Sequence, residues 1–398
     1  MKSYLILIGL TVMLVIPFCN NKEQPPTIVP EPQIPEDQTI VQESTTQEQQ
    51  NNQNIEYTHQ LVVDGIKIPW GMDFISENEF LVTEKSGTLY YINENEKHQI
   101  SGLPEIYLRR QGGLLDVALH PDFSKNQLIY FTISYSSPNK SGGNTALYSA
   151  KLDLEARQLN QLNQLFLGKE NSTSGTHFGS RIVFDKSNHL YFSIGDRGQR
   201  DLNPQDLSRD GGKIYRLNID GTIPKDNPFV GDDEANPAIY SFGHRNPQGM
   251  VTHPETGEIW INEHGPRGGD EINIIKSGKN YGWPKVTYGK NYNGSIISHK
   301  TSLDGMEQPI HHWTPSIAPS GMEISTSDKY PNWKGHVLVG SLKFRYLERL
   351  IIENEKVIRT EKELQDIGRV RSVKQGLDGY HYVGIEGLGV VRIIPKSK

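Results

Sequence analysis

The chain has 398 residues, including 38 glycines and 23 prolines, and its formal net charge is −6. This net charge does not indicate the basic surface that nucleic-acid binding would require. The single cysteine, Cys19, excludes an intrachain disulfide framework. The length would suit two ordinary domains, but one all-β propeller can also use it. Small molecules are therefore the expected partners.

The first residues have the form of an export signal. Lys2 is followed by an apolar run over residues 4–18, which ends directly at Cys19. The run is short for a membrane span and has the length of a signal-peptide core. We expect residues 1–19 to be a lipoprotein-type signal peptide and the protein to reach the periplasm or cell envelope, anchored by lipid at Cys19. An ordinary signal peptide with an incidental cysteine is the alternative, because no small residue precedes Cys19.

Residues 20–57 consist mainly of Pro, Gln, Glu, Asn and Thr. Such a segment cannot bury enough apolar surface to offset the entropy lost on ordering. It is expected to be a disordered tether, followed by one folded domain over residues 58–398.

From residue 58 onward, short β runs alternate with turns rich in Gly, Pro, Asn and Asp. One phrase recurs: a small residue, a short apolar run, a polar turn and a second β run. Its six copies begin at Gly71, Gly113, Gly179, Gly249, Gly321 and Arg371. This spacing is typical of propeller blades with variable loops. It predicts an all-β fold, a six-bladed β-propeller of four-stranded antiparallel blades, in which each copy supplies the two inner strands.

If the two runs of a copy form a hairpin, the residues before the first run and after the second lie at the same end of the blade. Six such ends would converge on one mouth of the central channel. The side chains at these ends are mostly polar or charged and include Gln111, His177, Arg245, Asn246, Lys343 and Arg369. Such a cluster suits an anionic polar ligand and acid–base chemistry.

Several short phrases follow one another in this region. They are QGGLL at 111–115, IGDRG at 194–198, GKIYR at 212–216, GHRNPQG at 243–249, EHGP at 263–266 and NYGWP at 280–284. Together and in this order they resemble the soluble PQQ-dependent sugar dehydrogenase family (glucose/sorbosone dehydrogenase type, aldose sugar dehydrogenases included). The resemblance implies oxidation of a sugar hydroxyl to a lactone or carbonyl, with pyrroloquinoline quinone (PQQ), Ca²⁺ and an external electron acceptor.

The resemblance also assigns three catalytic roles. His177 matches the general base that takes the substrate hydroxyl proton, a role that suits an imidazole. Asp196 matches the carboxylate that orients this histidine, although it could simply close a turn. Arg245 matches the cation that stabilises negative charge on the quinone oxygen.

The cofactor shell implied by the resemblance is rich in cations and amides. Its members are Gln111, Arg245, Asn246, Tyr292, Lys343, Arg369 and Arg371. Because PQQ carries three carboxylates, Lys and Arg are suitable partners. For the two arginines at 369 and 371, pairing across a blade is the alternative role.

Calcium in the resembled family is held largely by backbone oxygens, matched here by Gly265 and Pro266. A neighbouring structural calcium would use Glu271 and the carbonyl of Tyr281. Oxygen ligands suit this hard cation, which would polarise the reacting carbonyl as a Lewis acid. Backbone ligands leave no side-chain pattern, so these assignments rest on the resemblance alone.

Two other functions stay open at this point. One is a calcium-dependent hydrolase of the lactonase type, which would need more carboxylates at the mouth. The other is a non-catalytic propeller that binds a ligand at the cell surface. Residues 286–316 match the glucose enzymes poorly, so the sugar itself is left unassigned.

Overall fold

The computed structural model of the protein describes residues 55–138, 142–169 and 172–396. The predicted signal peptide, the predicted lipid site at Cys19 and nearly all of the predicted tether lie outside the described residues. Within the described ranges, no helix is long and apolar enough to cross a membrane.

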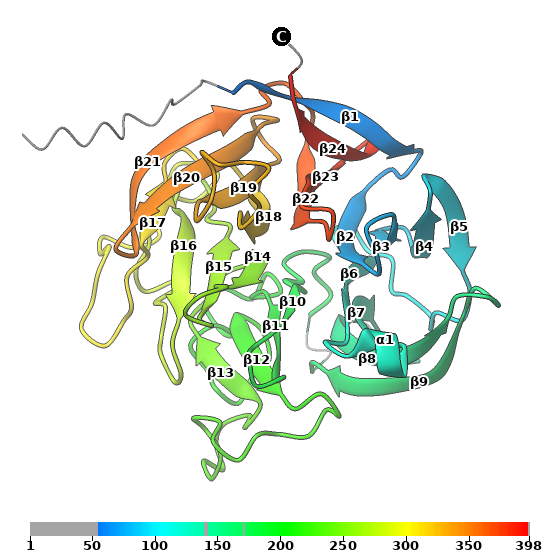
Figure 1. The fold of residues 1–398 in the computed structure, drawn as a ribbon. Helices are drawn as coiled ribbons and strands as arrows, with labels where there is room; N and C mark the ends of the chain where they lie inside the picture. Colours follow the sequence, from blue (N-terminus) through cyan, green and yellow to red (C-terminus); the bar gives the residue numbers. More distant parts are fainter. Residues whose placement is uncertain (1–54, 139–141, 170–171, 397–398) are drawn as a thin grey trace, which may run out of the picture. The chain divides into compact units, whose positions relative to one another are not determined.

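The described residues form six four-stranded antiparallel sheets around a central channel (Figure 1). The predicted six-bladed propeller is therefore confirmed. Each copy of the recurring phrase forms the two innermost strands of one blade, as expected. Apolar side chains occur on both faces of these inner strands because every blade packs face to face against its neighbours.

In each of the first three blades the innermost strand comes first in the chain and the outermost strand last. Blade 1 is β2 (Pro69–Phe74), β3 (Glu79–Glu84), β4 (Thr88–Asn93) and β5 (Glu96–Ile100). Blade 2 is β6 (Leu114–Leu119), β7 (Leu128–Tyr135), β8 (Asn144–Asp153) and β9 (Gln158–Leu167), with the one-turn helix α1 (Phe123–Asn126) after β6. Blade 3 is β10 (Ile182–Phe184), β11 (Leu190–Ile194), β12 (Lys213–Leu217) and β13 (Ile239–Phe242).

Blades 4 and 5 follow the same order, whereas blade 6 takes its outermost strand from the start of the folded domain. Blade 4 is β14 (Pro247–Thr252), β15 (Ile259–Glu263), β16 (Asp270–Ile275) and β17 (His311–Trp313). Blade 5 is β18 (Pro319–Ile324), β19 (Val337–Ser341), β20 (Leu347–Glu353) and β21 (Lys356–Glu363). Blade 6 is β22 (Val370–Gln375), β23 (His381–Ile385), β24 (Gly389–Pro395) and β1 (Tyr57–Asp64).

The ring is closed by the first strand of the domain. β1 pairs antiparallel with β24, from Tyr57 opposite Pro395 to Asp64 opposite Gly389. The sixth blade thus combines the two ends of the folded chain. The recurring phrase did not reveal this pairing, because β1 is an outer strand and the phrase marks only inner ones.

Side chains of the inner strands also bond to the backbone of the next blade. Thr132 donates to the carbonyl of Ser180 at 2.8 Å, and Ser320 donates to that of Val370 at 2.7 Å. Ser372 of the last blade donates to the carbonyl of Pro69 in the first at 2.9 Å. These buried bonds fix neighbouring blades relative to one another.

One buried cation connects several blades at once. Arg181, just before β10, pairs with Asp116 of blade 2 at 3.0 Å. It donates to the carbonyls of Gln248 in blade 4 at 2.7 Å and Arg371 in blade 6 at 3.1 Å. Its guanidinium also lies 4.1 Å from the ring centre of Trp70 in blade 1. Five of the six blades thus meet at this one side chain.

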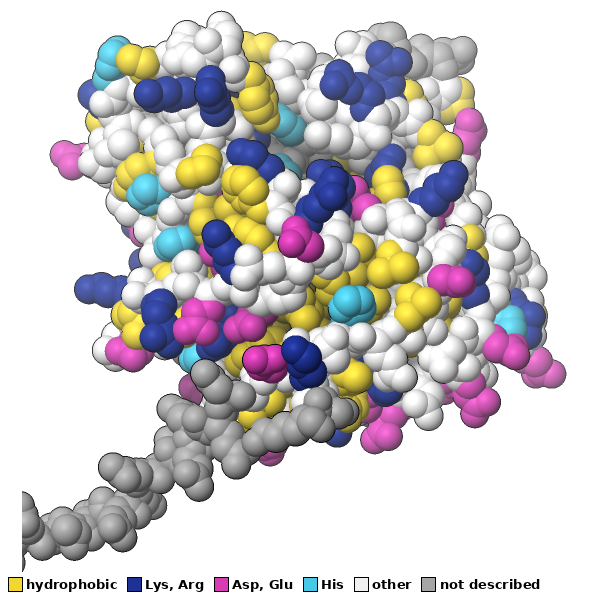
Figure 2. All heavy atoms as spheres, turned by 90° about the horizontal axis from the view of Figure 1, so that it is seen from above, with side chains coloured by type: hydrophobic (Ala, Val, Ile, Leu, Met, Phe, Trp, Pro, Cys, Tyr) yellow, Lys and Arg dark blue, Asp and Glu magenta, His cyan; other side chains and the backbone are white. Residues whose placement is uncertain are grey.

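Charged side chains are unevenly distributed on the side of the propeller that Figure 2 shows. In the edge-on view of Figure 2, Lys and Arg side chains predominate towards the upper rim and Asp and Glu towards the lower rim. A net charge of −6 is therefore compatible with a locally basic face.

Replacing Asp116 by Ala should destabilise the propeller strongly. The change leaves Arg181 buried without its carboxylate, which costs about 3–5 kcal/mol for pairs of this kind. We expect a lower midpoint in urea denaturation followed by circular dichroism. The exposed pair of Asp122 and Lys125 provides the control, and Asp122→Ala should leave the midpoint nearly unchanged. Equal midpoints for the two variants would contradict a structural role for the buried pair.

Candidate active site

The predicted mouth contains a cavity of about 880 Å³, here called the central cavity. It lies where loops before the first strand and after the second strand of several blades converge. Eight of the residues predicted to bind cofactor or metal line it: Gln111, Asn246, Gly265, Pro266, Tyr292, Lys343, Arg369 and Arg371. The structure therefore brings together residues that are up to 260 positions apart in the chain, from 111 to 371.

A second cavity of about 470 Å³, the side cavity, holds the three predicted catalytic residues, His177, Asp196 and Arg245. Pro266 and Tyr292 line both cavities and form their common wall. Tyr292 is 73% exposed, so it belongs to the rim rather than to the buried wall. The two cavities are neighbours, which would place a reactant in one beside a ligand in the other.

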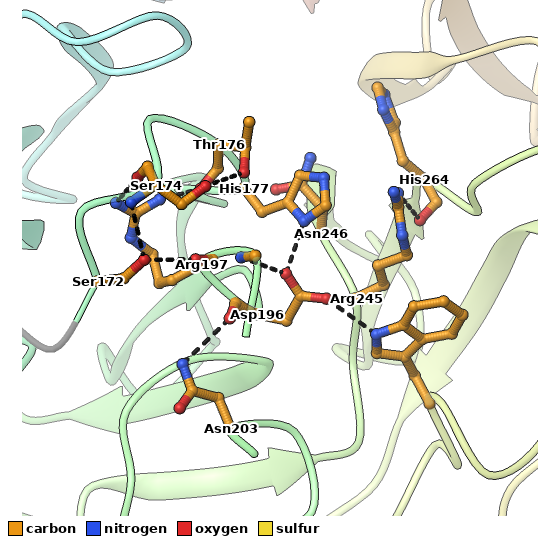
Figure 3. A network of polar contacts seen from close by, with 12 residues as sticks. Ser172, Ser174, Thr176, His177, Asp196, Arg197, Asn203, Arg245, Asn246 and His264 are labelled. Atoms are coloured by element: carbon orange, nitrogen blue, oxygen red, sulfur yellow. Dashed lines mark hydrogen bonds and ion pairs between the residues drawn. The ribbon is translucent and has the colours of Figure 1, made fainter. Parts of the chain in front are cut away.

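Figure 3 shows the hydrogen bonds that fix the His177–Asp196 pair. His177 Nδ1 lies 2.6 Å from Asp196 Oδ1. The same carboxylate accepts from the backbone N–H of Gly198 at 2.8 Å and, through Oδ2, from Trp283 Nε1 at 2.9 Å. His177 Nε2 has no hydrogen-bond partner among the described residues. The pair therefore leaves Nε2 of the imidazole available to a ligand, whereas the carboxylate of Asp196 already makes three hydrogen bonds.

The electrostatics favour a neutral imidazole. Burial lowers the pKa of His177 below its usual value, and the charge of Arg245 acts in the same direction, while Asp196 opposes them. Burial alone would raise the pKa of Asp196, but His177, Arg245 and the hydrogen bond from Trp283 outweigh it and lower that pKa. At neutral pH the arrangement is a neutral base beside an ionised carboxylate.

A buried arginine supports the loop that carries His177. His177 and Arg197 both have left-handed backbone conformations, with φ of 55° and 57°, which non-glycine residues adopt uncommonly. Arg197 donates to the carbonyls of Thr176 and Ser174, and its guanidinium lies 3.4 Å from the ring centre of Phe178. These contacts hold the loop in a conformation that the sequence alone would not favour.

The backbone N–H of His177 donates to Gln111 Oε1 at 2.7 Å. This bond joins a predicted catalytic residue in blade 3 to a predicted cofactor residue before blade 2. In the structure, Gln111 therefore positions His177 in addition to lining the central cavity.

Arg245 is held between the side cavity and the loop after β15. Its Nη1 donates to the carbonyls of His264 and Gly265, both at 2.9 Å. Its guanidinium lies 5.5 Å from the ring centre of Trp283. The carbonyl of Gly265, a predicted calcium ligand, is thus already bonded to Arg245.

Two predicted cofactor residues share one carboxylate. Arg369 Nε lies 2.5 Å from Glu386 Oε2, and Arg371 Nε donates to Glu386 Oε1 at 2.9 Å. Sequence reasoning missed Glu386, although it follows a second strand just as Asp196 does. Each guanidinium keeps further N–H groups for a ligand, because arginine has five.

Lys85 lies at the mouth, as its position after the second run of the first copy predicts, but the resemblance does not assign it to the cofactor shell. Its Nζ donates to the carbonyls of Arg110 and Gly112 at 2.9 and 3.3 Å, on either side of Gln111. Burial lowers the pKa of Lys85, and the charge of Arg371 adds to this effect.

The central cavity is strongly basic. Its lining contains the cations Lys85, Arg110, Arg267, Lys343, Arg369 and Arg371, against the single carboxylate of Glu386. This excess of positive charge suits a ligand with several carboxylates.

The remaining predicted metal ligands meet in a separate, much smaller cavity. Glu271 and Tyr281 line it with Glu263 and Gly265, whereas Pro266 lines the two larger cavities. Burial raises the pKa of Glu271 to about 8, and the charge of Glu263 adds to this effect. Glu263 also contacts His244 Nδ1 at 2.9 Å, and Arg245 lines the same cavity. Two neighbouring carboxylates nevertheless provide the oxygen ligands that a hard metal ion prefers.

Side chains alone do not complete such a site. Within the described residues, no group of three or more His, Cys, Asp or Glu side chains could hold a metal ion. Backbone oxygens would have to supply the other ligands, as predicted.

The sequence is similar to known sugar dehydrogenases. The glucose/sorbosone dehydrogenase family profile matches residues 66–390. The chain is 39% identical to the aldose sugar dehydrogenase of Escherichia coli over 331 residues, which is 81% of this chain and 88% of that protein. It is 30% identical to quinoprotein glucose dehydrogenase B of Acinetobacter calcoaceticus over 307 residues, 70% of this chain and 61% of that protein.

The fold agrees with these sequence matches. The crystal structure of the apo-form of the E. coli aldose sugar dehydrogenase superposes with a TM-score of 0.82 at 35% identity, covering 85% of this chain and 100% of that one. Both the profile match and the identities extend over most of the propeller. The chain therefore belongs to the glucose/sorbosone dehydrogenase family.

Proposed function

We propose that this protein oxidises an aldose-type sugar hydroxyl to the lactone or carbonyl, with PQQ as cofactor. The observation that carries the proposal is the neutral His177 base, held by Asp196, in a cavity that adjoins the basic central cavity. The family supports sugar oxidation, and the A. calcoaceticus relative is named a quinoprotein.

The residues present fit PQQ. The central cavity of about 880 Å³ is within the usual range for cofactor sites. Lys343, Arg369 and Arg371 would hold the carboxylates, while Gln111 and Asn246 would bond to the ring system. When bound, PQQ supplies the two-electron acceptor that takes the hydride from the substrate carbon.

His177 and Asp196 accept and stabilise the proton that the substrate hydroxyl loses. His177 Nε2 takes the hydroxyl proton as the carbon–hydrogen bond breaks, and the ionised Asp196 stabilises the imidazolium that results. Trp283 and Gly198 keep the carboxylate in place, which keeps the histidine oriented. Arg245 offers a positive charge where negative charge develops on the acceptor. The proton later leaves His177 for solvent through the side cavity.

Calcium is the second proposed cofactor. Glu271 and the carbonyl of Tyr281 would hold a structural ion, and the carbonyls of Gly265 and Pro266 an ion beside the quinone. When bound there, calcium supplies a Lewis acid. The Gly265 carbonyl has a second lone pair available, in addition to the one that accepts from Arg245.

We also propose that residues 1–19 direct export and that lipid at Cys19 is the only membrane contact. An exported dehydrogenase needs an external electron acceptor that can reach the mouth. A lactonase is disfavoured because six cations and one carboxylate line the central cavity, whereas a calcium-dependent hydrolase of that type would need several carboxylates at the mouth.

Titration with PQQ and calcium, followed by dye-linked oxidation of a panel of aldoses, tests the function directly. We expect calcium-dependent PQQ binding and dye reduction. His177→Ala should lower kcat by about 10²- to 10⁴-fold, because general-base catalysis contributes that much. His59→Ala, an exposed histidine on β1, is the control and should keep full activity. Absence of PQQ binding at micromolar concentrations would refute the cofactor assignment. Lactonase activity would then be the next function to assay.

The pH dependence tests the role of Asp196. Asp196 raises the pKa of His177 against burial, so Asp196→Asn should lower that pKa further. We expect the acid limb of the kcat/KM profile to move to lower pH while kcat falls by about 10²-fold or more. The matched control is Asp201→Asn, a carboxylate that lines the same cavity, and its acid limb should stay in place. A shift to higher pH in Asp196→Asn would contradict the mechanism.

Calcium binding is tested through stability. Saturating calcium should raise the Tm of the wild-type protein, because a ligand at 100 times its Kd adds about 2.7 kcal/mol. Glu271→Gln should remove most of this gain, since it replaces an ionic ligand with a neutral amide. Glu255→Gln, an exposed turn residue, should keep the whole gain. Equal calcium-induced shifts in all three proteins would show that Glu271 is not a ligand.

A further inference from the structure

We propose that Lys213, a buried residue that lines neither of the two large cavities, is a positioning residue for the sugar in the side cavity. The inference rests on the proposed function, because it concerns where the substrate of that reaction binds. Lys213 belongs to the GKIYR phrase at 212–216, which plays no part in the proposed mechanism. It is the first residue of β12 and follows a long loop over residues 195–212, here called the β11–β12 loop.

The β11–β12 loop forms one wall of the side cavity. The lining includes a continuous stretch of this loop: Gly198, Gln199, Arg200, Asp201 and Leu202. None of residues 195–212 lines the central cavity, and the loop contains no helix or strand. A loop of this length is uncommon in a compact domain and is usually functional. A sugar in the side cavity would therefore rest against a wall whose position depends on how this loop is held.

Lys213 holds the loop from inside the protein. Its Nζ donates to three backbone carbonyls, those of Asn203 at 2.5 Å, Gly211 at 2.9 Å and Pro204 at 3.2 Å. Lys213 is fully buried, and lysine is almost never fully buried unless it is paired. The ammonium group therefore acts as an internal cation around which the loop is folded.

The three bonds favour the charged form of Lys213. Burial lowers its pKa to about 7, and the charges of Asp210 and Asp206 oppose this effect. Only the ammonium form has three N–H groups for the three carbonyls, because a neutral amine has two. Hydrogen bonds to a charged form stabilise that form. An apolar side chain of the same length would leave all three carbonyls without this donor.

Two side chains connect the anchored part of the loop to the side cavity. Asn203 Nδ2 donates to the carbonyl of Asp196 at 3.1 Å (Figure 3), and its backbone N–H donates to the carbonyl of Gln199 at 2.9 Å. Gln205 Nε2 donates to the carbonyl of Trp283 at 2.9 Å, and Trp283 lines the side cavity as well. The anchored part of the loop is thus bonded to several parts of the wall.

The His177–Asp196 pair is held by contacts that do not involve Lys213. The backbone N–H of Asp196 donates to the carbonyl of Arg245 at 2.7 Å, and its carboxylate is bonded to three groups. Arg197 holds the loop that carries His177. Loss of the Lys213 ammonium should therefore move the wall that the sugar contacts more than the base that takes its proton.

Lys213→Met, which removes the ammonium at nearly constant volume, tests this role in the protein loaded with PQQ and calcium. KM for the best aldose should rise by about tenfold or more, because misplacing groups around a reactant by about 1 Å can cost about 10²-fold. The decrease in kcat should be smaller. PQQ affinity, measured by fluorescence titration, should stay unchanged because the loop does not line the central cavity. Lys225→Met replaces an exposed lysine and is the control, which should change neither quantity.

Hydrogen–deuterium exchange gives a readout that does not depend on activity. In Lys213→Met, the amides of residues 199–212 should exchange faster than in the wild type, whereas those around His177 should not. Gln205→Ala changes a half-buried residue of the same loop. It should raise KM and loop exchange by smaller factors, and it provides the test if Lys213→Met does not fold.

The possible outcomes separate this inference from the proposed function. An unchanged KM despite faster loop exchange, or unchanged exchange in Lys213→Met, would overturn the inference and leave the proposed function untouched. Equal losses of PQQ affinity and sugar affinity would also overturn it, because Lys213 would then support the whole fold. A wild-type protein that oxidises no aldose would refute the proposed function and, with it, the role of Lys213 in sugar binding.

Discussion

The buried guanidinium of Arg181 is the contact on which the centre of this propeller depends. It bonds to Asp116 and to two backbone carbonyls of other blades, and it covers the ring of Trp70. Trp70, Gln248 and Arg371, which it contacts, also line the central cavity. The cation that holds the blades together therefore also supports the floor of the candidate active site.

Much of the fold was predictable because the inner strands repeat a local pattern. A hairpin sets both of its open ends on one side, so Gln111, Arg245 and Lys343 could be placed at a common mouth from spacing alone. The closing strand β1 was not predictable in this way. It pairs with β24 across almost the whole chain, and outer strands carry no marker that distinguishes them from other amphipathic runs.

The individual residues of the site were predicted mainly by resemblance, and their mutual contacts were not predicted. The indole of Trp283 reaches Asp196 from a loop 87 positions away. Glu386 pairs with both Arg369 and Arg371, which the resemblance assigns to the cofactor shell and for which pairing across a blade was the alternative. Such contacts depend on how the blades are placed around the ring. A sequence motif specifies which residues are present, whereas the fold decides which charges they meet.

Arg181 also lies between two cavities of the molecule. A further cavity of about 290 Å³ is lined by Arg181 itself, with Asp73, Glu323 and Lys374, and it shares no lining residue with the central cavity. The neighbours that Arg181 bonds to, Gln248 and Arg371, line the central cavity instead. A substitution that moved this one guanidinium would therefore change the shape of both cavities, so the stability of the ring and the shape of the candidate site cannot vary independently.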